Sequence, residues 1–207
     1  CRSVFGRFLA PNSIVGCGIE MAPEAEWSGV KAKYELPDEY VLYLGRVSKA
    51  KVDKLLPYFL RCKAKYGGDA KLVLVGGFEN EIRKFDSPDI LFTGYVSDEE
   101  KTAIVRHATV MVNPSPMESL SLLMLEGMQS RIPLLVNGRS KVMKDHCRLS
   151  GAGLWYNNGR DFRKKLHRLL SDPELRRTMS EKGPAYVREH YDWEIIIPKL
   201  RTLIESI

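Results

Sequence analysis

The sequence has no long apolar run and no closely spaced pair of cysteines. Its four cysteines, Cys1, Cys17, Cys62 and Cys147, are scattered along the chain, and none forms a C-x-x-C pair. This pattern is more typical of reduced thiols than of a disulfide scaffold. No apolar segment approaches the roughly 18 residues that a transmembrane helix requires. We therefore expect a cytoplasmic protein without a membrane span, for which peripheral contact with a membrane remains open.

The sequence also lacks a dense basic block and any metal-ligand spacing. The net charge is +6, but Lys and Arg are spread along the chain, so we expect no nucleic-acid partner. His107, His167 and His190 are too isolated to suggest a metal site. His146 and Cys147 are adjacent in sequence, and such neighbours rarely face each other as a nucleophile and its base. We expect no protein-bound metal and no cofactor.

What the sequence does contain is a regular alternation of short apolar runs with helical patterns. We predict strands at 40–47, 70–77, 89–96, 109–115, 132–138 and 153–158. We predict helices at 53–67, 97–108, 120–131, 161–170, 173–190 and 193–206. The strands are apolar throughout, as expected of parallel strands covered on both faces. The predicted fold is α/β, a doubly wound parallel sheet of the Rossmann-like type.

The same patterns divide the chain into three parts. Residues 1–39 show little periodicity and are expected to be a connector. Residues 40–190 hold the predicted sheet and its helices, and residues 191–207 form a final helix. Two of the predicted helix starts are marked by Asp53 and by Ser97, and the latter forms a capping box with Glu100. Pro173 occupies a first helical position.

The segment PMESLSLLMLEGM, residues 116–128, places one glutamate at each end of an apolar run. We expect Glu118 in a loop at the carboxyl edge of the sheet, where ligands of such sheets bind. We expect Ser119 to cap a helix that begins near Leu120 and carries Glu126 two turns later. The two carboxylates would then hold opposite ends of one elongated ligand. The alternative is that Glu118 only caps the helix and Glu126 is an ordinary exposed residue.

Two elements at this edge favour an anionic ligand. The first is the start of the helix, where the amides of Ser119 to Leu122 point outward and the helix dipole is positive. The second is the loop after the first strand, which carries Arg46, Lys49 and Lys51. Arginine is suited to bidentate phosphate binding, and lysine adds a point charge.

These residues resemble a known family. The E-x7-E pattern, the G-R-x4-K pattern that begins at Gly45, and FTGYVSDEE between them are similar to the C-terminal, nucleotide-sugar-binding domain of the group 1 glycosyltransferases. These are retaining enzymes of family 4 with the GT-B fold, and the likeness runs in register from about residue 12 to 207. Further segments that carry it are SIVGCGIE, YVLYLGRV, KLVLVGG, PLLVNGR, GAGLWYNN and YVREHYDW. The chain departs from the family at KAKVD, which lacks a glycine, and at Lys141, where glutamate is common.

The resemblance implies catalytic roles for three residues. Arg46 and Lys51 would bind the diphosphate of a nucleotide-sugar and neutralise the leaving group, with Gly45 in the same loop. The shortened KAKVD segment leaves open whether Lys49 takes the place of Lys51. Glu118 would lie beside the sugar ring, near the anomeric carbon.

The resemblance also implies how the rest of the donor is bound. The backbone amides of Ser119, Leu120, Ser121 and Leu122 would hold phosphate and sugar hydroxyls. Glu126 would accept hydrogen bonds from the ribose. The backbone around Tyr95 and Val96 would contact the base. The identity of the sugar and of the base, whether UDP, GDP or ADP, stays open.

The implied activity is transfer of a hexosyl group from a nucleotide-diphosphate sugar to a carbohydrate or lipid-linked acceptor, with retention at the anomeric carbon. In the family the acceptor site lies on a separate N-terminal domain, so residues 1–39 would be the hinge from that domain. The final helix would cross back onto it, and the 207-residue chain alone is expected to be inactive. The alternatives are a GT-B sugar-nucleotide epimerase and a non-catalytic nucleotide-sugar-binding domain.

Overall fold

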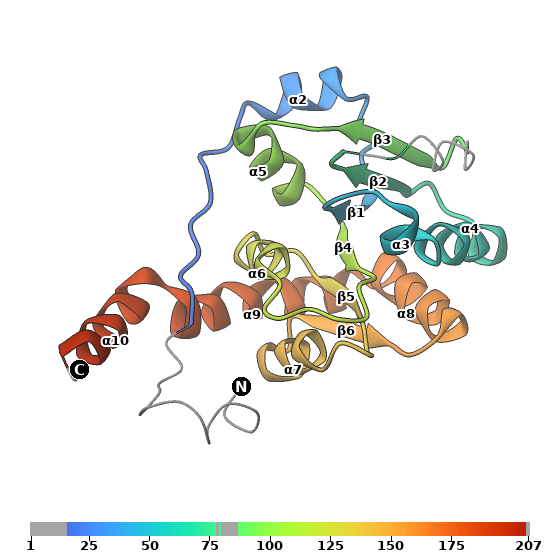
Figure 1. Ribbon diagram of the computed structural model, residues 1–207. Helices are drawn as coiled ribbons and strands as arrows, with labels where there is room; N and C mark the ends of the chain where they lie inside the picture. Colours follow the sequence, from blue (N-terminus) through green and yellow to red (C-terminus); the bar gives the residue numbers. More distant parts are fainter. Residues whose placement is uncertain (1–15, 78, 80–86, 206–207) are drawn as a thin grey trace.

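A single parallel sheet organises the molecule. The structure is a computed structural model that describes residues 16–77, 79 and 87–205. The strands of the described part are β1 (Tyr40–Leu44), β2 (Lys71–Val75), β3 (Ile90–Gly94), β4 (Val110–Asn113), β5 (Leu134–Asn137) and β6 (Gly153–Tyr156). They pair in the order β3-β2-β1-β4-β5-β6 (Figure 1). Every pairing is parallel, so the predicted Rossmann-like fold is confirmed.

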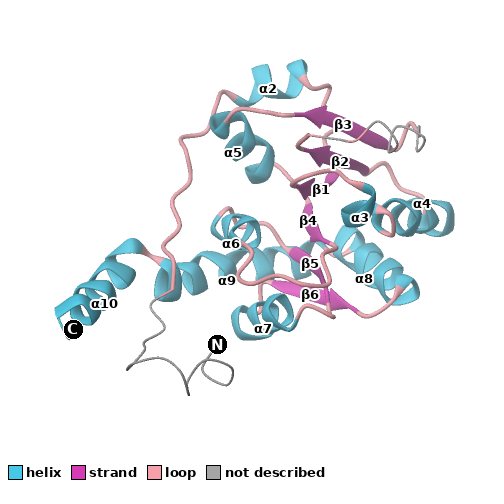
Figure 2. Cartoon of the chain, in the orientation of Figure 1, coloured by secondary structure: helices cyan, strands magenta, loops and turns pink. Residues whose placement is uncertain are grey.

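Helices cover both faces of this sheet (Figure 2). In chain order they are α2 (Trp27–Lys33), α3 (Lys49–Val52), α4 (Leu55–Tyr66), α5 (Asp98–Arg106), α6 (Leu122–Gln129), α7 (Lys141–Ser150), α8 (Gly159–Ser171), α9 (Pro173–Tyr191) and α10 (Trp193–Glu205). Alternate strand residues enter opposite cores. Tyr40 and Leu42 pack with α5, α6 and α7, whereas Val41 and Tyr43 pack with α4 and α8. Burial on both faces explains why the strands are apolar throughout.

Three described helices, α2, α3 and α7, have no counterpart among the sequence predictions. Helix α2 lies within the segment that was expected to be a connector, and its Val30 is buried in the same core as α5 and α6. Helix α7 buries Met143 and Cys147, which are spaced by one helical turn among polar neighbours. The predicted hinge up to residue 15 and the end of the final helix at 206–207 lie outside the described residues.

The helix predicted at 53–67 is present as α4, and the short helix α3 precedes it where a loop was expected. Helix α3 ends at Val52 with Asp53 as its C-cap, so the prediction of Asp53 as an N-cap is wrong. Helix α4 begins afresh at Leu55, which places Pro57 in its first turn. Proline is tolerated there because its missing N–H has no partner within the helix.

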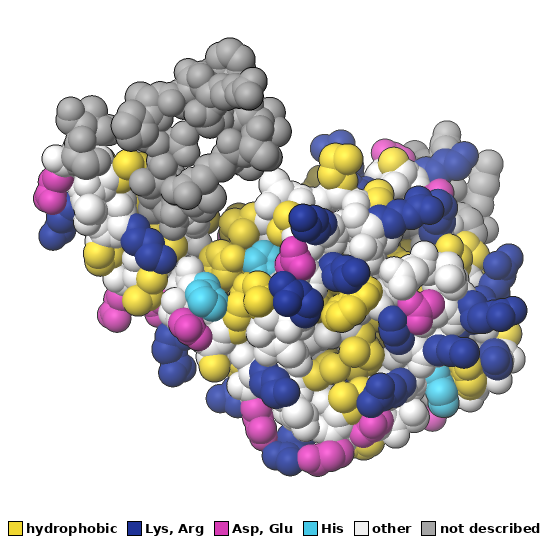
Figure 3. Space-filling view, turned by 90° about the horizontal axis from the view of Figure 1, so that it is seen from below, with side chains coloured by type: hydrophobic (Ala, Val, Ile, Leu, Met, Phe, Trp, Pro, Cys, Tyr) yellow, Lys and Arg dark blue, Asp and Glu magenta, His cyan; other side chains and the backbone are white. Residues whose placement is uncertain are grey.

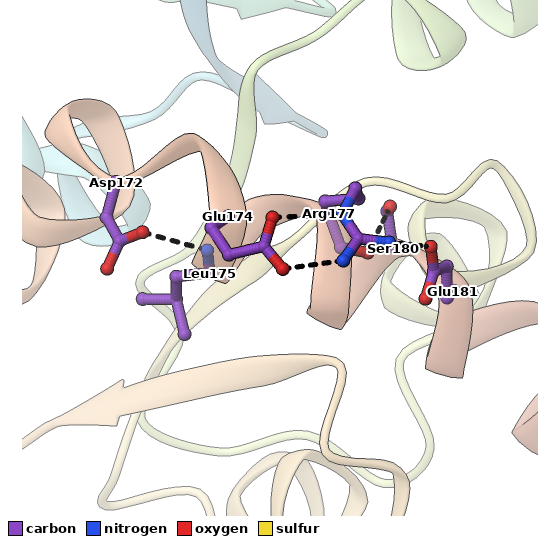
Figure 4. A network of polar contacts seen from close by, with 6 residues as sticks. All are labelled: Asp172, Glu174, Leu175, Arg177, Ser180 and Glu181. Carbon is purple, nitrogen blue, oxygen red and sulfur yellow. Dashed lines mark hydrogen bonds and ion pairs between the residues drawn. The ribbon is translucent and has the colours of Figure 1, made fainter.

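Other predicted helix starts are confirmed. Ser97 Oγ accepts from the Glu100 amide at 3.2 Å, and the Glu100 carboxylate accepts from the Ser97 amide at 3.0 Å, which completes the capping box. Pro173 opens α9, where the Asp172 side chain accepts from the Leu175 amide. Figure 4 shows that cap together with an ion-pair chain on the same helix, in which Arg177 contacts Glu174 and Glu181.

Candidate functional site

The strand order reverses between β1 and β4, and the main cavity opens at this point. The chain proceeds outward from β1 to β3 and then returns to place β4 on the other side of β1. Loops after these two strands therefore diverge and leave a crevice at the carboxyl edge. A cavity of about 530 Å³ occupies it. Its lining includes eight residues predicted from the sequence: Gly45, Arg46, Lys51, Glu118, Ser119, Leu120, Ser121 and Leu122.

The loop that carries Glu118 ends in an unusual turn. Helix α6 begins at Leu122, and its N-cap is Ser121, with φ 64° and ψ 71°. The prediction that Ser119 caps a helix starting near Leu120 is therefore wrong. The left-handed turn at Ser121 delays the helix by about two residues. The amides of Met124 and Leu125 donate to the Ser121 carbonyl, whereas Leu122 and Leu123, which precede them, line the cavity.

Asn113, the last residue of β4, holds both ends of this loop. Its Nδ2 donates to Ser121 Oγ at 3.1 Å, and its Oδ1 accepts from the Ser115 amide at 3.0 Å. Asn137, at the end of β5, donates to the Pro114 carbonyl at 2.9 Å. Two neighbouring strand ends thus fix the course of the loop that presents Glu118.

Opposite charges meet inside the cavity. Lys51 Nζ lies 4.0 Å from Glu118 Oε1. Tyr43 is buried and lines the same cavity, and its hydroxyl donates to the Arg46 carbonyl at 2.8 Å. Burial, assisted by the negative charge of Glu118, raises the pKa of Tyr43 to about 12, so its hydroxyl remains a donor. The lysine that lines this cavity is Lys51.

Lys49 takes a different position. It begins α3 and is exposed, and its backbone amide donates to Glu79 Oε2 at 3.3 Å. Among the described residues, Lys51 lines the 530 Å³ cavity and Lys49 does not.

A second cavity, of about 300 Å³, continues from the first along the same sheet edge. The two share Leu44, Gly45, Arg46 and Leu123 in their walls. The second is completed by Gly76 and Gly77 after β2 and by Tyr95 and Val96 after β3. The Tyr95 side chain is 86% exposed. We call the two adjoining cavities the trough, and Arg46 belongs to the wall that they share.

Glu126 lines neither cavity but contacts the wall of the second one through Lys101. Its side chain is 13% exposed, and Oε1 is 3.4 Å from Lys101 Nζ, which lines the second cavity. Its Oε2 is buried and has no hydrogen-bond partner among the described residues. A buried acceptor without a partner is costly unless a ligand or water satisfies it. The alternative in which Glu126 is an ordinary exposed helix residue is wrong.

His146 and Cys147 are unsuited to nucleophilic chemistry. Burial raises the pKa of the Cys147 thiol to about 12, which disfavours the reactive thiolate. His146 Nδ1 lies 2.8 Å from the Tyr186 hydroxyl and thereby joins α7 to α9. Among the described residues no three His, Cys, Asp or Glu side chains gather as metal ligands do.

Figure 3 shows Lys and Arg distributed over one face among acidic and apolar side chains, without a single basic block. Across the described helices, none combines the length and the apolar character needed to cross a bilayer.

Comparison with known proteins identifies the family. Residues 29–186 match the model of the family described as "Glycosyl transferases group 1". The chain belongs to this family. It is 30% identical over 174 residues to an alpha-D-kanosaminyltransferase of Streptomyces kanamyceticus, a match that covers 77% of this chain and 44% of that protein. The chain spans between 32% and 48% of several curated relatives that it matches.

Solved structures of GT-B enzymes share the fold of this group 1 domain. Sucrose-phosphate synthase of Thermosynechococcus elongatus superimposes with a TM-score of 0.76 at 21% identity, covering 99% of this chain and 55% of that one. HepE of Anabaena, in complex with UDP and glucose, superimposes with a TM-score of 0.71 at 13% identity, covering 87% and 52%.

Three residues of the trough were missed by sequence reasoning. Asn113 ends a strand, Lys101 lies within a helix, and Tyr43 is a strand residue among apolar neighbours. None of the three belongs to a sequence motif with a recognisable residue spacing. The sequence offered only their position in the predicted elements, because polar residues at the carboxyl ends of parallel strands lie at the edge where ligands bind. That signal would have found Asn113.

Proposed function

We propose that this domain binds a nucleotide-diphosphate sugar in the trough and takes part in transfer of the sugar with retention at the anomeric carbon. The observation that carries the proposal is the trough itself, with Arg46 in the wall that its two cavities share, Glu118 in the first cavity, and the unsatisfied Glu126 carboxylate beside Lys101 of the second. The donor has the same three-part form of sugar, diphosphate and ribose. The HepE structure contains UDP and glucose, which supports the assignment.

The diphosphate would bind where positive charge converges. Arg46, Lys51 and the first turn of α6 border the same cavity. When the bond between sugar and phosphate breaks, negative charge grows on the leaving phosphate. Donors already fixed at that place stabilise the transition state without reorganising. Glu118 would favour the positive charge that develops on the sugar, and the acceptor would attack from the face that the phosphate leaves.

We infer that the chain's own cations replace a metal ion in this role. Donor binding is therefore expected to survive EDTA. We would measure nucleotide-sugar affinity by calorimetry with and without the chelator. A large loss of affinity on chelation that Mn²⁺ restores would contradict this inference.

The first test of the proposal is a thermal-shift panel of UDP-, GDP- and ADP-sugars on the 207-residue chain. A ligand that binds only the folded state stabilises it by about 2.7 kcal/mol when the ligand concentration is one hundred times Kd. The added stability raises the midpoint temperature of thermal unfolding. We expect one base class to raise it. Arg46→Gln should abolish the shift, whereas Arg61→Gln, on an exposed part of α4, should leave it intact.

Two outcomes would overturn the donor assignment. One is that no nucleotide-sugar raises the midpoint of the wild-type chain. The other is that Arg46→Gln retains the full shift, since the diphosphate would then bind elsewhere.

A further inference from the structure

A separate cavity of about 260 Å³ lies beyond the carboxyl ends of β5 and β6. Its walls come from the region between α3 and α4, from the prolines of the Glu118 loop, and from the loops after β5 and β6. It adjoins the donor trough at Lys51 and Pro114, which line both cavities. No role in the proposed donor binding uses the rest of this wall.

The charge of this cavity is mainly positive. Lys51, Lys54 and Arg139 line it, against one carboxylate, Asp53. Lys54 and Arg139 form no ion pair with any residue in the described ranges. Two cations left without partners beside a concave wall favour an anionic ligand with oxygen acceptors, such as a phosphate group.

A tyrosine whose hydroxyl has no partner among the described residues also lines this cavity. Tyr156, the last residue of β6, lines it although its side chain is only 5% exposed. Its ring packs edge-on against Tyr58 and Phe162. Within the described part of the chain its hydroxyl has no hydrogen-bond partner. Burial raises the pKa of Tyr156, so the hydroxyl stays protonated and can donate to a ligand.

The remaining polar side chains of this cavity are better suited to binding hydroxyl groups of a ligand than to binding a second anionic group. Asp53 is an acceptor, and the side chain of Asn157 both donates and accepts. A ligand that carries one phosphate and several hydroxyls would use the cations and these groups together. A bare anion would leave Asp53 facing a like charge.

We propose that this cavity is a second binding site, which takes a phosphorylated sugar beside the donor trough. Lys54 and Arg139 hold the phosphate, Tyr156 donates a hydrogen bond to the ligand, and Asp53 with Asn157 binds sugar hydroxyls. This site goes beyond the proposed donor binding, because its occupation requires neither a nucleotide nor Arg46.

Calorimetry on the 207-residue chain with glucose 6-phosphate, inorganic phosphate and glucose tests the proposal. We expect glucose 6-phosphate to bind more tightly than either fragment. The double variant Lys54→Gln/Arg139→Gln should weaken it by at least about tenfold, the effect of losing charge-assisted hydrogen bonds. Lys164→Gln/Arg188→Gln removes the same charge from exposed positions of α8 and α9 and should change nothing.

Three results would overturn this second site. The first is equal loss in both double variants, which means unspecific attraction to positive charge. The second is phosphate binding as tightly as glucose 6-phosphate, which removes the sugar contacts. The third is complete displacement of glucose 6-phosphate by a saturating concentration of the nucleoside diphosphate selected in the thermal-shift panel, which places it in the donor trough. If none of UDP, GDP and ADP binds, the donor proposal fails and this test remains valid.

Tyr156→Phe provides a measurement that a merely structural role would not reproduce. The ring and its packing remain, and only the hydroxyl is removed. We expect glucose 6-phosphate affinity to fall by roughly three- to tenfold while the thermal midpoint of the free chain stays unchanged. Unchanged affinity, or a lower midpoint that accounts for the loss, would remove Tyr156 from the site.

Discussion

Two glutamates on one segment differ sharply in their surroundings. The Glu118 side chain is 25% exposed and lies 4.0 Å from Lys51, so water and an ion partner share its solvation. Glu126 is more buried and has one oxygen without a partner among the described residues. A ligand hydroxyl would therefore gain more from Glu126 than from Glu118, because the buried acceptor has no water to lose.

This difference separates the two carboxylates experimentally. Glu126→Ala should weaken binding of the free nucleoside diphosphate, by about 1.5–3 kcal/mol for each charge-assisted hydrogen bond lost. Glu118→Ala should leave that affinity nearly intact. In a full-length enzyme the same change should reduce turnover by about two to three orders of magnitude, as when one preorganised electrostatic group is lost. Calorimetry with the nucleoside diphosphate measures the binding part.

A third variant controls this comparison. Glu99→Ala removes an exposed carboxylate from the first turn of α5 and should bind the nucleotide like the wild type. Equal losses for Glu118→Ala and Glu126→Ala would mean that both carboxylates serve one part of the ligand. Wild-type affinity in Glu126→Ala would leave its buried oxygen without the ribose role.

Among the elements, α2 and α5 are joined through one carboxylate. Glu100 accepts from Lys33 Nζ at 2.6 Å and from the Tyr34 hydroxyl at 2.8 Å, in addition to the Ser97 amide of the capping box. Lys33 contributes most to lowering the pKa of Glu100 to about 2, and the Ser97 amide contributes next. The helix that the sequence did not predict is thus attached to one that it did.

The attachment predicts a pH dependence. A carboxylate with a lowered pKa stabilises the folded state above its ordinary value of 4.5, and the contribution is lost as pH falls toward about 2. Stability should therefore decline across this window, and Glu100→Gln should reduce the decline. Urea midpoints of both proteins between pH 2 and 7 provide the measurement. Parallel curves at all pH values would exclude this role of Glu100.

A close approach between α6 and α9 depends on one glycine. A Cβ atom added at Gly183 would lie 2.5 Å from the Met128 carbonyl oxygen, which belongs to the backbone and cannot rotate away. Gly183→Ala should therefore destabilise the fold by about 1–3 kcal/mol, despite the higher helix propensity of alanine. Arg188→Ala, on the exposed side of α9, should have little effect. Denaturant unfolding measures both, and a Gly183→Ala variant as stable as the wild type would contradict the predicted clash.

The elements that sequence reasoning located well are those with a strong local pattern. The strands are buried on both faces and therefore apolar, and the capping box at Ser97 is a two-residue signature. Helix α7 was missed because polar residues surround its buried Met143 and Cys147. The start of α6 was misplaced because the apolar run continues through Ser121, whose left-handed backbone leaves no trace in hydrophobic spacing.

In the candidate site, too, the residues with a distinctive local sequence pattern were predicted and the others were missed. Residues on the loops after β1 and β4 were found because their chemistry and spacing are distinctive. Asn113 was missed because its role is to bond both ends of a loop, which only the folded backbone reveals. The assignment of Lys51 rather than Lys49 to the cavity likewise depends on the direction in which α3 turns.

At the scale of the whole molecule, α10 extends away from the sheet (Figure 1). Its exposed apolar side chains are Trp193, Ile195, Ile197, Leu200 and Ile204. The chain spans less than half of several curated relatives, including 44% of the kanosaminyltransferase. These two facts support the proposal that transfer requires a further domain, which would cover α10 and supply the acceptor site.

The corresponding prediction is that the 207-residue chain binds donor without transferring its sugar. Positioning of two reactants contributes on the order of 7–11 kcal/mol to a bimolecular step, and this contribution is absent when only the donor is held. Incubation with the nucleotide-sugar selected by thermal shift, labelled in its sugar, should leave the label on the donor in the presence of carbohydrate or lipid-linked acceptors. Robust transfer to an acceptor would show that the trough and its neighbouring cavity are sufficient for catalysis. Release of an epimerised nucleotide-sugar would instead assign the trough to epimerase chemistry.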